Sequence, residues 1–198
     1  MLHASIWMKP LAVNASSIYF FVMTHERNVN LIGALALALA DIVEKSLAGD
    51  APEPGAAAAA LLLIHHRPGF LTERLHGVIG LSQPGTVRLV DRLVRDGLVL
   101  RKPGEVDRRT VELHLTEEGL RRTTAMARKR SSALAQTLAV LSNREMTDLA
   151  RIAEKLLHSL PVDERHAYEI CRYCHEACCT HCPVDAGTPL RDPHSALV

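Results

Sequence analysis

The strongest constraint on the fold is a change of hydrophobic period between Ser82 and Leu115. Ser82 has the form of a helix N-cap, and Pro84 falls in the first turn, where its missing N–H costs little. The apolar residues that follow recur at helical spacing until Gly97, a natural left-handed C-cap. These signals predict a helix over residues 82–96.

Beyond this helix, apolar residues alternate with polar ones, as they do in a half-buried strand. Leu98–Arg101 and Thr110–Leu115 are expected to be strands, separated by the charged segment Lys102–Arg109. In the second strand the apolar side chains share one face, which places Glu112 and His114 on the other. The sequence therefore predicts a β-hairpin with an extended basic tip.

Most of the remaining chain has the pattern of helices. Aromatic residues make up only 4% of it, so the core must be built from aliphatic residues, of which Leu and Ala favour helix. Apolar spacing predicts helices at residues 28–47, 56–66, 70–77, 117–141 and 142–160. The expected fold class is mainly α with a small β-hairpin wing, that is, a winged helix-turn-helix with N- and C-terminal dimerisation helices.

The first and last of these helices predict self-association. Residues 28–47 and 142–160 are too apolar for the surface of a lone small domain. A two-fold homodimer would cover both helices.

This organisation divides the chain into five segments. They are an N-terminal leader (1–27), a dimerisation helix with its linker (28–55), the winged helix-turn-helix (56–116), two long dimerisation helices (117–160) and a Cys-rich tail (161–198). No stretch reaches the roughly 18 apolar residues of a membrane span, so we expect no membrane partner and a cytoplasmic protein. The apolar run Leu11–Met23 lacks a convincing cleavage site, which disfavours a signal peptide; alternatively, Met23 is the natural start.

The short helix, tight turn and serine-capped helix predict a helix-turn-helix, whose second helix fits the major groove of DNA. On that helix, Val87, Val90 and Val94 are expected to face the core. Gly85 removes a side chain where the backbone either approaches phosphates or packs against the preceding helix. The polar residues left for the outer side, where they can contact base edges, are Gln83, Thr86, Arg88, Arg92 and Arg95.

The hairpin tip adds Arg108 and Arg109, which suit a narrow minor groove, with Asp107 as a local partner that orients one of them. Residues 67–130 carry 14 Lys and Arg against 8 Asp and Glu, a net charge of +6 in a chain whose total is +1. This asymmetry is typical of a nucleic-acid surface; the alternative is a solvated charged face with weak salt bridges. No nucleophile elbow, phosphate-binding glycine loop or metalloprotease motif is present, so we expect no enzyme.

The predicted winged helix-turn-helix resembles that of a known protein family. The segment GLSQPGTVRLVDRLVRDGLVLRKPGEVDRRTVELHLTEEG resembles the winged helix-turn-helix core of the MarR family of bacterial regulators. The GLS start, the V-R-L-V-D-R-L helix, the D-x-R wing tip and the L-T-x-x-G exit all match. The close match covers Leu81–Gly119, and the helix order extends it to about Asn28–Leu160.

The resemblance implies an obligate homodimer in which the first and last helices interlock. Each recognition helix would then enter one half of a palindrome in double-stranded DNA, and a small-molecule effector could bind between the dimerisation and DNA-binding parts. It also implies that Asp107 holds Arg109 at the wing tip. Residues implied at or near the DNA are Ser82, Gln83, Thr86, Arg88 and Arg92.

All five cysteines of the chain lie between Cys171 and Cys182 and mark a local site. Four soft ligands in so short a segment suit a tetrahedral zinc site, and the Cys182-Pro183 ending also resembles iron–sulfur motifs. A thiol switch is the third alternative. The ligands expected are Cys171, Cys174, Cys178 and Cys182, with Cys179, His175 and His181 as substitutes.

Two function classes follow from these motifs. The first is a DNA-binding regulator, expected to be a repressor, whose cysteine tail senses metal or redox state. The second is a metal- or redox-handling cysteine protein with incidental DNA contact, which leaves the pattern of residues 82–116 unexplained. The resemblance itself assigns no metal ligands, because the core of the family does not require the cysteines.

Overall fold

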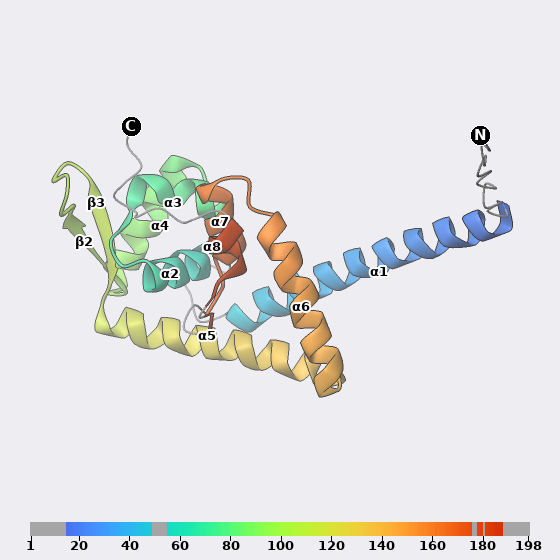
Figure 1. The fold of residues 1–198 in the computed structure, drawn as a ribbon. Helices are drawn as coiled ribbons and strands as arrows, with labels where there is room; N and C mark the ends of the chain where they lie inside the picture. The colour runs from blue at the N-terminus through green and yellow to red at the C-terminus, as the bar shows by residue number, and fades with distance from the viewer. Residues whose placement is uncertain (1–14, 49–54, 176–177, 180, 188–198) are drawn as a thin grey trace, which may run out of the picture. The chain divides into compact units, whose positions relative to one another are not determined.

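The computed structural model describes residues 15–48, 55–175, 178–179 and 181–187. The chain divides into two units, Met1–Asp41 and Ile42–Val198. In chain order (Figure 1) the elements are α1 (Ala15–Leu47), α2 (Ala56–His66), β1 (Phe70–Leu71), α3 (Thr72–Ile79), α4 (Gln83–Arg95), β2 (Val99–Pro103), β3 (Val111–Leu115), α5 (Glu117–Leu138), α6 (Asn143–Ser159), α7 (Glu164–Cys171) and α8 (Pro183–Gly187). The predicted fold class, mainly helical with a small β wing, is confirmed.

The core of the second unit is built around α2. Every residue of Ala57–Ile64 is buried, as expected of a helix that is apolar all round. The elements α5, β3 and α3 pack around it. The helix predicted at residues 56–66 is therefore confirmed, and it is the central helix of the domain.

A three-stranded antiparallel sheet adjoins this core in the order β1-β3-β2. The hairpin is as predicted, with Val99 opposite Leu115 in the register of β2 and β3. The helix expected from Phe70 is wrong at its start, because Phe70–Leu71 form β1 and pair with β3. The pairing of β1 with β3 satisfies backbone groups of β3 that would otherwise lie at a buried edge. The helix α3 therefore begins only at Thr72.

The caps predicted from sequence determine several helix ends. Ser82 caps α4 and Asp96 ends it, so the helix predicted at 82–96 is confirmed. Ser142 and Glu145 form a capping box that starts α6. The helix expected to run to residue 141 ends instead at Leu138.

The helix predicted from Asn28 is longer than expected. It begins at Ala15, inside the segment assigned to an N-terminal leader. No proline or glycine lies between Ala15 and Asn28, so nothing in that stretch breaks a helix. None of the described helices is long and apolar enough to cross a membrane.

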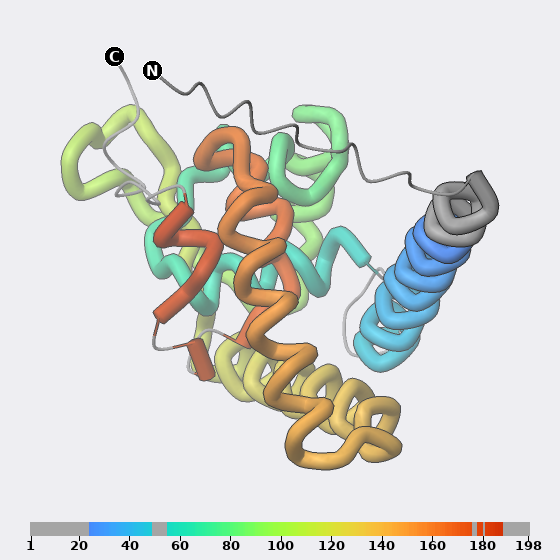
Figure 2. The backbone as a smooth tube through the Cα atoms, turned by 45° about the vertical axis from the view of Figure 1, so that its right-hand side comes forward, coloured from blue at the N-terminus to red at the C-terminus, as the bar shows by residue number. Residues whose placement is uncertain are grey.

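The Cys-rich tail contains two short helices that the sequence did not predict. α7 packs against α3, where Arg74 and Glu164 form an ion pair at 2.7 Å. Tyr168 of α7 is buried and meets Phe70 edge to face, with ring centroids 5.2 Å apart. α8 packs against α6, and the two lie side by side in the tube view (Figure 2). The tail therefore contacts both the helix-turn-helix and the last long helix.

Candidate nucleic-acid interface

The first turn of α4 is held by a side-chain cap. Ser82 Oγ accepts a hydrogen bond from the Gly85 amide at 3.3 Å, and Pro84 occupies the same turn. A Cβ at Gly85 would lie only 3.2 Å from this Oγ, so glycine leaves room for the cap. The other N–H groups of the first turn have no carbonyl partner within the helix. They are therefore available to an anion such as phosphate.

The buried face of α4 differs from the expected one. Thr86 is 1% exposed and lies in the core, whereas Val87 is 43% exposed. Thr86 is therefore not on the outer face, and Val87 does not face the core. The reason is that the buried positions follow Leu89 and Leu93 at helical spacing, and Thr86, three residues before Leu89, falls on that stripe.

The exposed face of α4 carries two arginines, one aspartate, one glutamine and one valine. Arg92 is only half-buried at its margin. The residues that this face presents are Gln83, Val87, Arg88, Asp91 and Arg95. Of the predicted base-contacting residues, Gln83, Arg88 and Arg95 are thus exposed on this face.

An ion pair joins the wing to α4. Arg101 of β2 reaches Asp91 of α4 at 2.7 Å, and both side chains are partly exposed. Sequence reasoning did not single out either residue, because they belong to different elements and only the fold brings them together. The pair fixes the hairpin beside the exposed face of α4.

The wing tip is ordered by backbone contacts. Asp107 Oδ1 accepts from the backbone amide of Arg109 at 2.9 Å, and the Asp107 carbonyl accepts from the Thr110 hydroxyl at 2.7 Å. Among the described residues no ion pair joins Asp107 to Arg108 or Arg109, so Asp107 shapes the turn and does not hold a guanidinium. Both arginine side chains are exposed. Gly104 is required here, since a Cβ would lie 2.5 Å from the Asp107 carbonyl oxygen.

A buried carboxylate supports the wing from its base. Glu112, expected on the polar face of β3, is only 2% exposed. Its Oε1 accepts from the Glu105 amide at 2.9 Å, and its Oε2 lies 3.2 Å from His114 Nε2. The short strand β1 covers this side of β3, which explains the burial. No periodicity argument could have found this, because it depends on a third strand.

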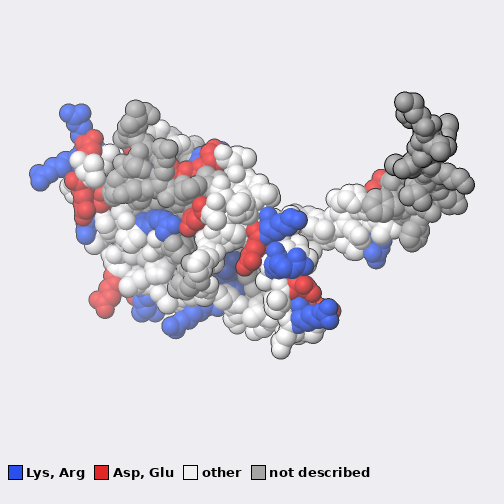
Figure 3. All heavy atoms as spheres, viewed as in Figure 1, with Lys and Arg blue, Asp and Glu red and all other residues white. Residues whose placement is uncertain are grey.

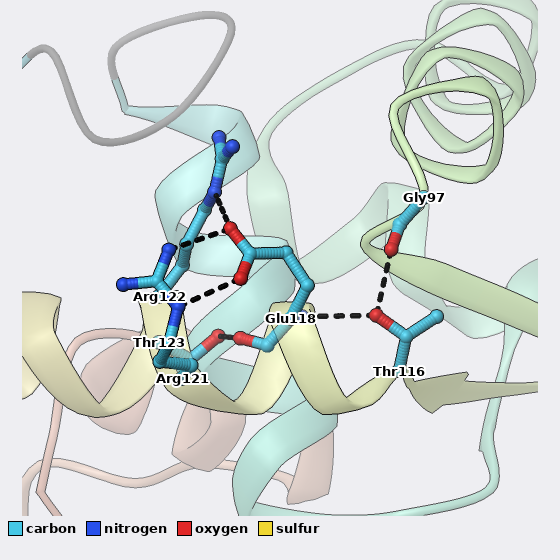
Figure 4. Close-up of polar contacts among 7 residues, drawn as sticks. Gly97, Thr116, Glu118, Arg121, Arg122 and Thr123 are labelled. Carbon is cyan, nitrogen blue, oxygen red and sulfur yellow. Dashed lines mark hydrogen bonds and ion pairs between the residues drawn. The ribbon is translucent and has the colours of Figure 1, made fainter.

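The end of α4 is locked to the start of α5 (Figure 4). The Thr116 hydroxyl donates to the Gly97 carbonyl at 2.7 Å and accepts from the Gly119 amide at 2.9 Å. A Cβ at Gly119 would lie 2.0 Å from the Leu98 carbonyl oxygen, so this contact is close. The junction connects the hairpin and α4 rigidly to the long helix α5.

The first turn of α5 is charged. Glu118 makes hydrogen-bonded ion pairs with Arg121 and Arg122, each at 2.7 Å. These two guanidinium groups lower the pKa of Glu118 to about 2. The carboxylate also lies near the positive end of the α5 dipole, which favours the same charged form.

Basic side chains are exposed on the hairpin. In the space-filling view, blue side chains project from it at the left, with red ones beside them (Figure 3). The arrangement offers a helix for a wide groove and an arginine-bearing loop for a narrow one.

The tail cysteines lie away from this interface, around a separate cavity of about 40 Å³. Three of the four expected ligands, Cys171, Cys174 and Cys182, line it. The fourth cysteine of the lining is Cys179, and the expected Cys178 instead lies with its Sγ 3.3 Å from His175 Nδ1. In the described ranges no group of three or more Cys, His, Asp or Glu side chains already stands in an arrangement that would hold a metal ion.

Comparison with known proteins places this geometry in a family. Residues 56–111 match the model of the MarR family. The HTH-type transcriptional repressor MdtR of Bacillus subtilis (strain 168) is 33% identical over 99 residues, which cover 46% of this chain and 64% of MdtR. The HTH-type transcriptional regulator PetP of Rhodobacter capsulatus is 37% identical over 60 residues, 30% of this chain and 36% of PetP. Each match spans less than two thirds of the relative's length.

Solved structures agree with the sequence matches. A MarR family protein from Bacillus stearothermophilus is 27% identical and superposes with a TM-score of 0.59, covering 68% of this chain and 93% of that protein. The proteins matched by sequence are named as transcriptional regulators. Residues 56–111 thus match the MarR family, and the chain shares the winged helix-turn-helix fold of these proteins.

Proposed function

We propose that the chain is a transcriptional repressor that binds a palindromic operator in double-stranded DNA as a homodimer. The observation that carries the proposal is the continuity of the interface. The Arg101–Asp91 ion pair fixes the hairpin beside the exposed face of α4. The name of the relative MdtR, a repressor, supports repression as the direction of control.

In the proposed complex, α4 enters the major groove. Gln83 and Arg88 are exposed near its N-terminal end, where the side chains of a recognition helix meet base edges. Glutamine can pair with adenine and arginine with guanine. Arg108 and Arg109 at the wing tip would enter the adjoining minor groove, where a narrow groove has a strongly negative potential.

A dimer accounts for the apolar surface that remains. In α1, the side chains of Ile32 and Leu37 are 63% and 73% exposed. In α6, Ile152 and Leu156 are 48% and 54% exposed, and the helix has no buried residue at all. Such faces on two long helices are typical of an interface between subunits. A two-fold dimer would present two copies of α4 to a palindrome.

The proposal is tested by DNA binding of an arginine variant. Arg88→Ala is expected to weaken binding to the operator upstream of the protein's own gene by about 5- to 150-fold, equivalent to the ~1–3 kcal/mol of a base contact. Fluorescence anisotropy with a labelled duplex measures this. Arg144→Ala is the matched control, because it removes the same charge from an exposed residue at the start of α6. The start of α6 adjoins the end of α5 that points away from the hairpin (Figure 1).

Salt dependence tests whether the basic side chains neutralise DNA phosphates. Affinity for the operator should fall steeply with salt, and Arg108→Ala should lower the slope of log affinity against log salt by about one unit. An affinity that does not change with salt, or equal losses for Arg88→Ala and Arg144→Ala, would overturn the proposal.

We further propose that the cysteine tail makes this repressor responsive to metal or redox state. The support is structural: α7 packs on α3 of the helix-turn-helix, and α8 packs on α6. A change in the tail would therefore shift α3 relative to α6. Only a ligand that binds one arrangement of these helices more tightly than another can cause such a shift. If Cys→Ser changes at positions 171, 174, 178 and 182 leave operator affinity unchanged under metal-replete and oxidising conditions alike, this regulation is wrong. A small-molecule effector stays a prediction.

A further inference from the structure

The cavity in the tail is lined by four cysteines that come from two separate pairs. Cys171 and Cys174 form one C-x-x-C pair at the end of α7, and Cys179 and Cys182 form the second just before α8. Two such pairs are the usual way for a short chain segment to supply four thiolates to one ion. The sequence analysis expected Cys178 as the ligand in the second pair, with Cys179 as a substitute.

The structure separates those two neighbours. Both are exposed, but Cys179 lines the cavity with the other three, whereas Cys178 lies outside the lining and contacts His175. The cavity thus brings together four thiols, two from each C-x-x-C pair.

Cationic side chains surround the same cavity. Arg67, at the end of α2, lines it and lies 4.0 Å from Asp185 of α8. Arg130 of α5 lies close enough to Cys179 for an electrostatic interaction. The Arg130 Nε is buried and has no hydrogen-bond partner among the described residues. A divalent ion with four thiolates carries a net charge of −2. The two arginines, of which Arg67 is paired with Asp185, offset part of it.

The lining of the cavity indicates the kind of metal centre. It offers two C-x-x-C pairs, the usual ligand pattern of a structural zinc site in a short segment. Four sulfur ligands around one small ion is the arrangement of structural zinc, with Zn–S distances of about 2.3 Å.

We propose that Cys171, Cys174, Cys179 and Cys182 bind one zinc ion as a tetrathiolate site, and that Cys178 is not a ligand. Binding displaces up to four thiol protons, and the metal completes an arrangement that the thiols alone do not form. The site itself does not depend on the proposed DNA-binding function, so each can fail without the other.

The site would clamp three parts of the molecule together. His66 Nε2 at the end of α2 donates to the Cys174 carbonyl. On the other side, Gly187 at the end of α8 is so close to α6 that a Cβ would lie 2.3 Å from the His158 carbonyl oxygen. Zinc would therefore fix the ends of α7 and α8 against α2 and α6.

The test begins with the full-length wild-type chain, purified anaerobically without chelator. Elemental analysis is expected to find one zinc per chain, with no visible absorption. Replacement by Co²⁺ should produce the intense visible bands of tetrahedral sulfur coordination. Iron and sulfide with a visible spectrum, a disulfide in place of bound metal, or no metal after incubation with Zn²⁺ would each overturn the proposal.

Alkylation of the wild-type chain then identifies the ligands without any variant that could fail to fold. With zinc bound, mass mapping should find Cys178 modified and the other four cysteines protected. After chelation all five should react. Protection of Cys178 equal to that of Cys179 would contradict the assignment.

A matched pair of variants completes the test. Cys179→Ser is expected to weaken zinc binding by about 100-fold or more, since even changes beyond the metal's own ligands cost 10–100-fold. Cys178→Ser, the same change one residue away, should leave zinc affinity within about twofold, well below that range. Equal losses from the two substitutions would overturn the ligand set.

Discussion

At the scale of single residues, the buried carboxylate of Glu112 supports the wing. Glu112→Ala would leave the Glu105 amide and His114 without this partner, and should destabilise the domain by about 1.5–3 kcal/mol. Urea unfolding followed by circular dichroism measures the loss. Glu105→Ala is the control, because Glu105 contributes its backbone amide to this contact and its own side chain is exposed. Equal effects of the two substitutions would show that Glu112 has no special role.

At the scale of elements, the junction between α4, β2 and α5 depends on a glycine. Gly119→Ala places a methyl group against the Leu98 carbonyl, which is backbone and cannot turn aside, so α5 must shift from the hairpin. We expect a loss of about 2 kcal/mol or more in the free energy of unfolding, as for other overpacked sites. Chemical denaturation measures it.

The matched control for this substitution is Gly77→Ala in α3. There the new Cβ would meet only the Arg165 side chain, at 3.1 Å, which is flexible. Alanine is also the better helix former, by up to about 1 kcal/mol. A loss for Gly77→Ala as large as that for Gly119→Ala would contradict a specific role for the junction.

At the scale of the whole molecule, the exposed apolar face of α6 should control assembly. Leu156→Glu is expected to raise the dimer dissociation constant by about 10- to 100-fold, because burying a leucine contributes ~1.5–3 kcal/mol. Analytical ultracentrifugation measures the change, and operator affinity should fall with it. Lys155→Glu, a neighbouring exposed position, should have little effect. A dimer unaffected by Leu156→Glu would remove α6 from the interface.

Much of the candidate interface could be predicted from sequence because it depends on local chemistry. The caps at Ser82 and Thr116, the left-handed Gly97 and the capping box at Ser142 each involve residues within one turn. The hairpin has a clear alternating pattern, so its strands could be located as well. These features were enough to indicate a winged helix-turn-helix before any coordinates.

Contacts between distant segments could not be predicted in this way. The strand β1 forms only because β3 offers it a partner, and that pairing in turn buries Glu112. Thr86 was predicted to be exposed on α4 and Val87 to be buried, but the structure shows the reverse. Thr86 belongs to the buried stripe that continues through Leu89 and Leu93. One helical position is a rotation of about 100°, so a small error in the buried stripe exchanges neighbouring residues.

The sequence by itself determined helix α4, the hairpin and the clustering of the cysteines, since caps, periodicity and residue type act over a few neighbouring residues. Tertiary structure decided which side chains these elements expose. It also decided that Cys179 and not Cys178 lines the cavity with Cys171. That choice depends on how α7 packs against α3, which is far away along the chain, and how α8 packs against α6. Packing of this kind is set by the whole core, and no local pattern encodes it.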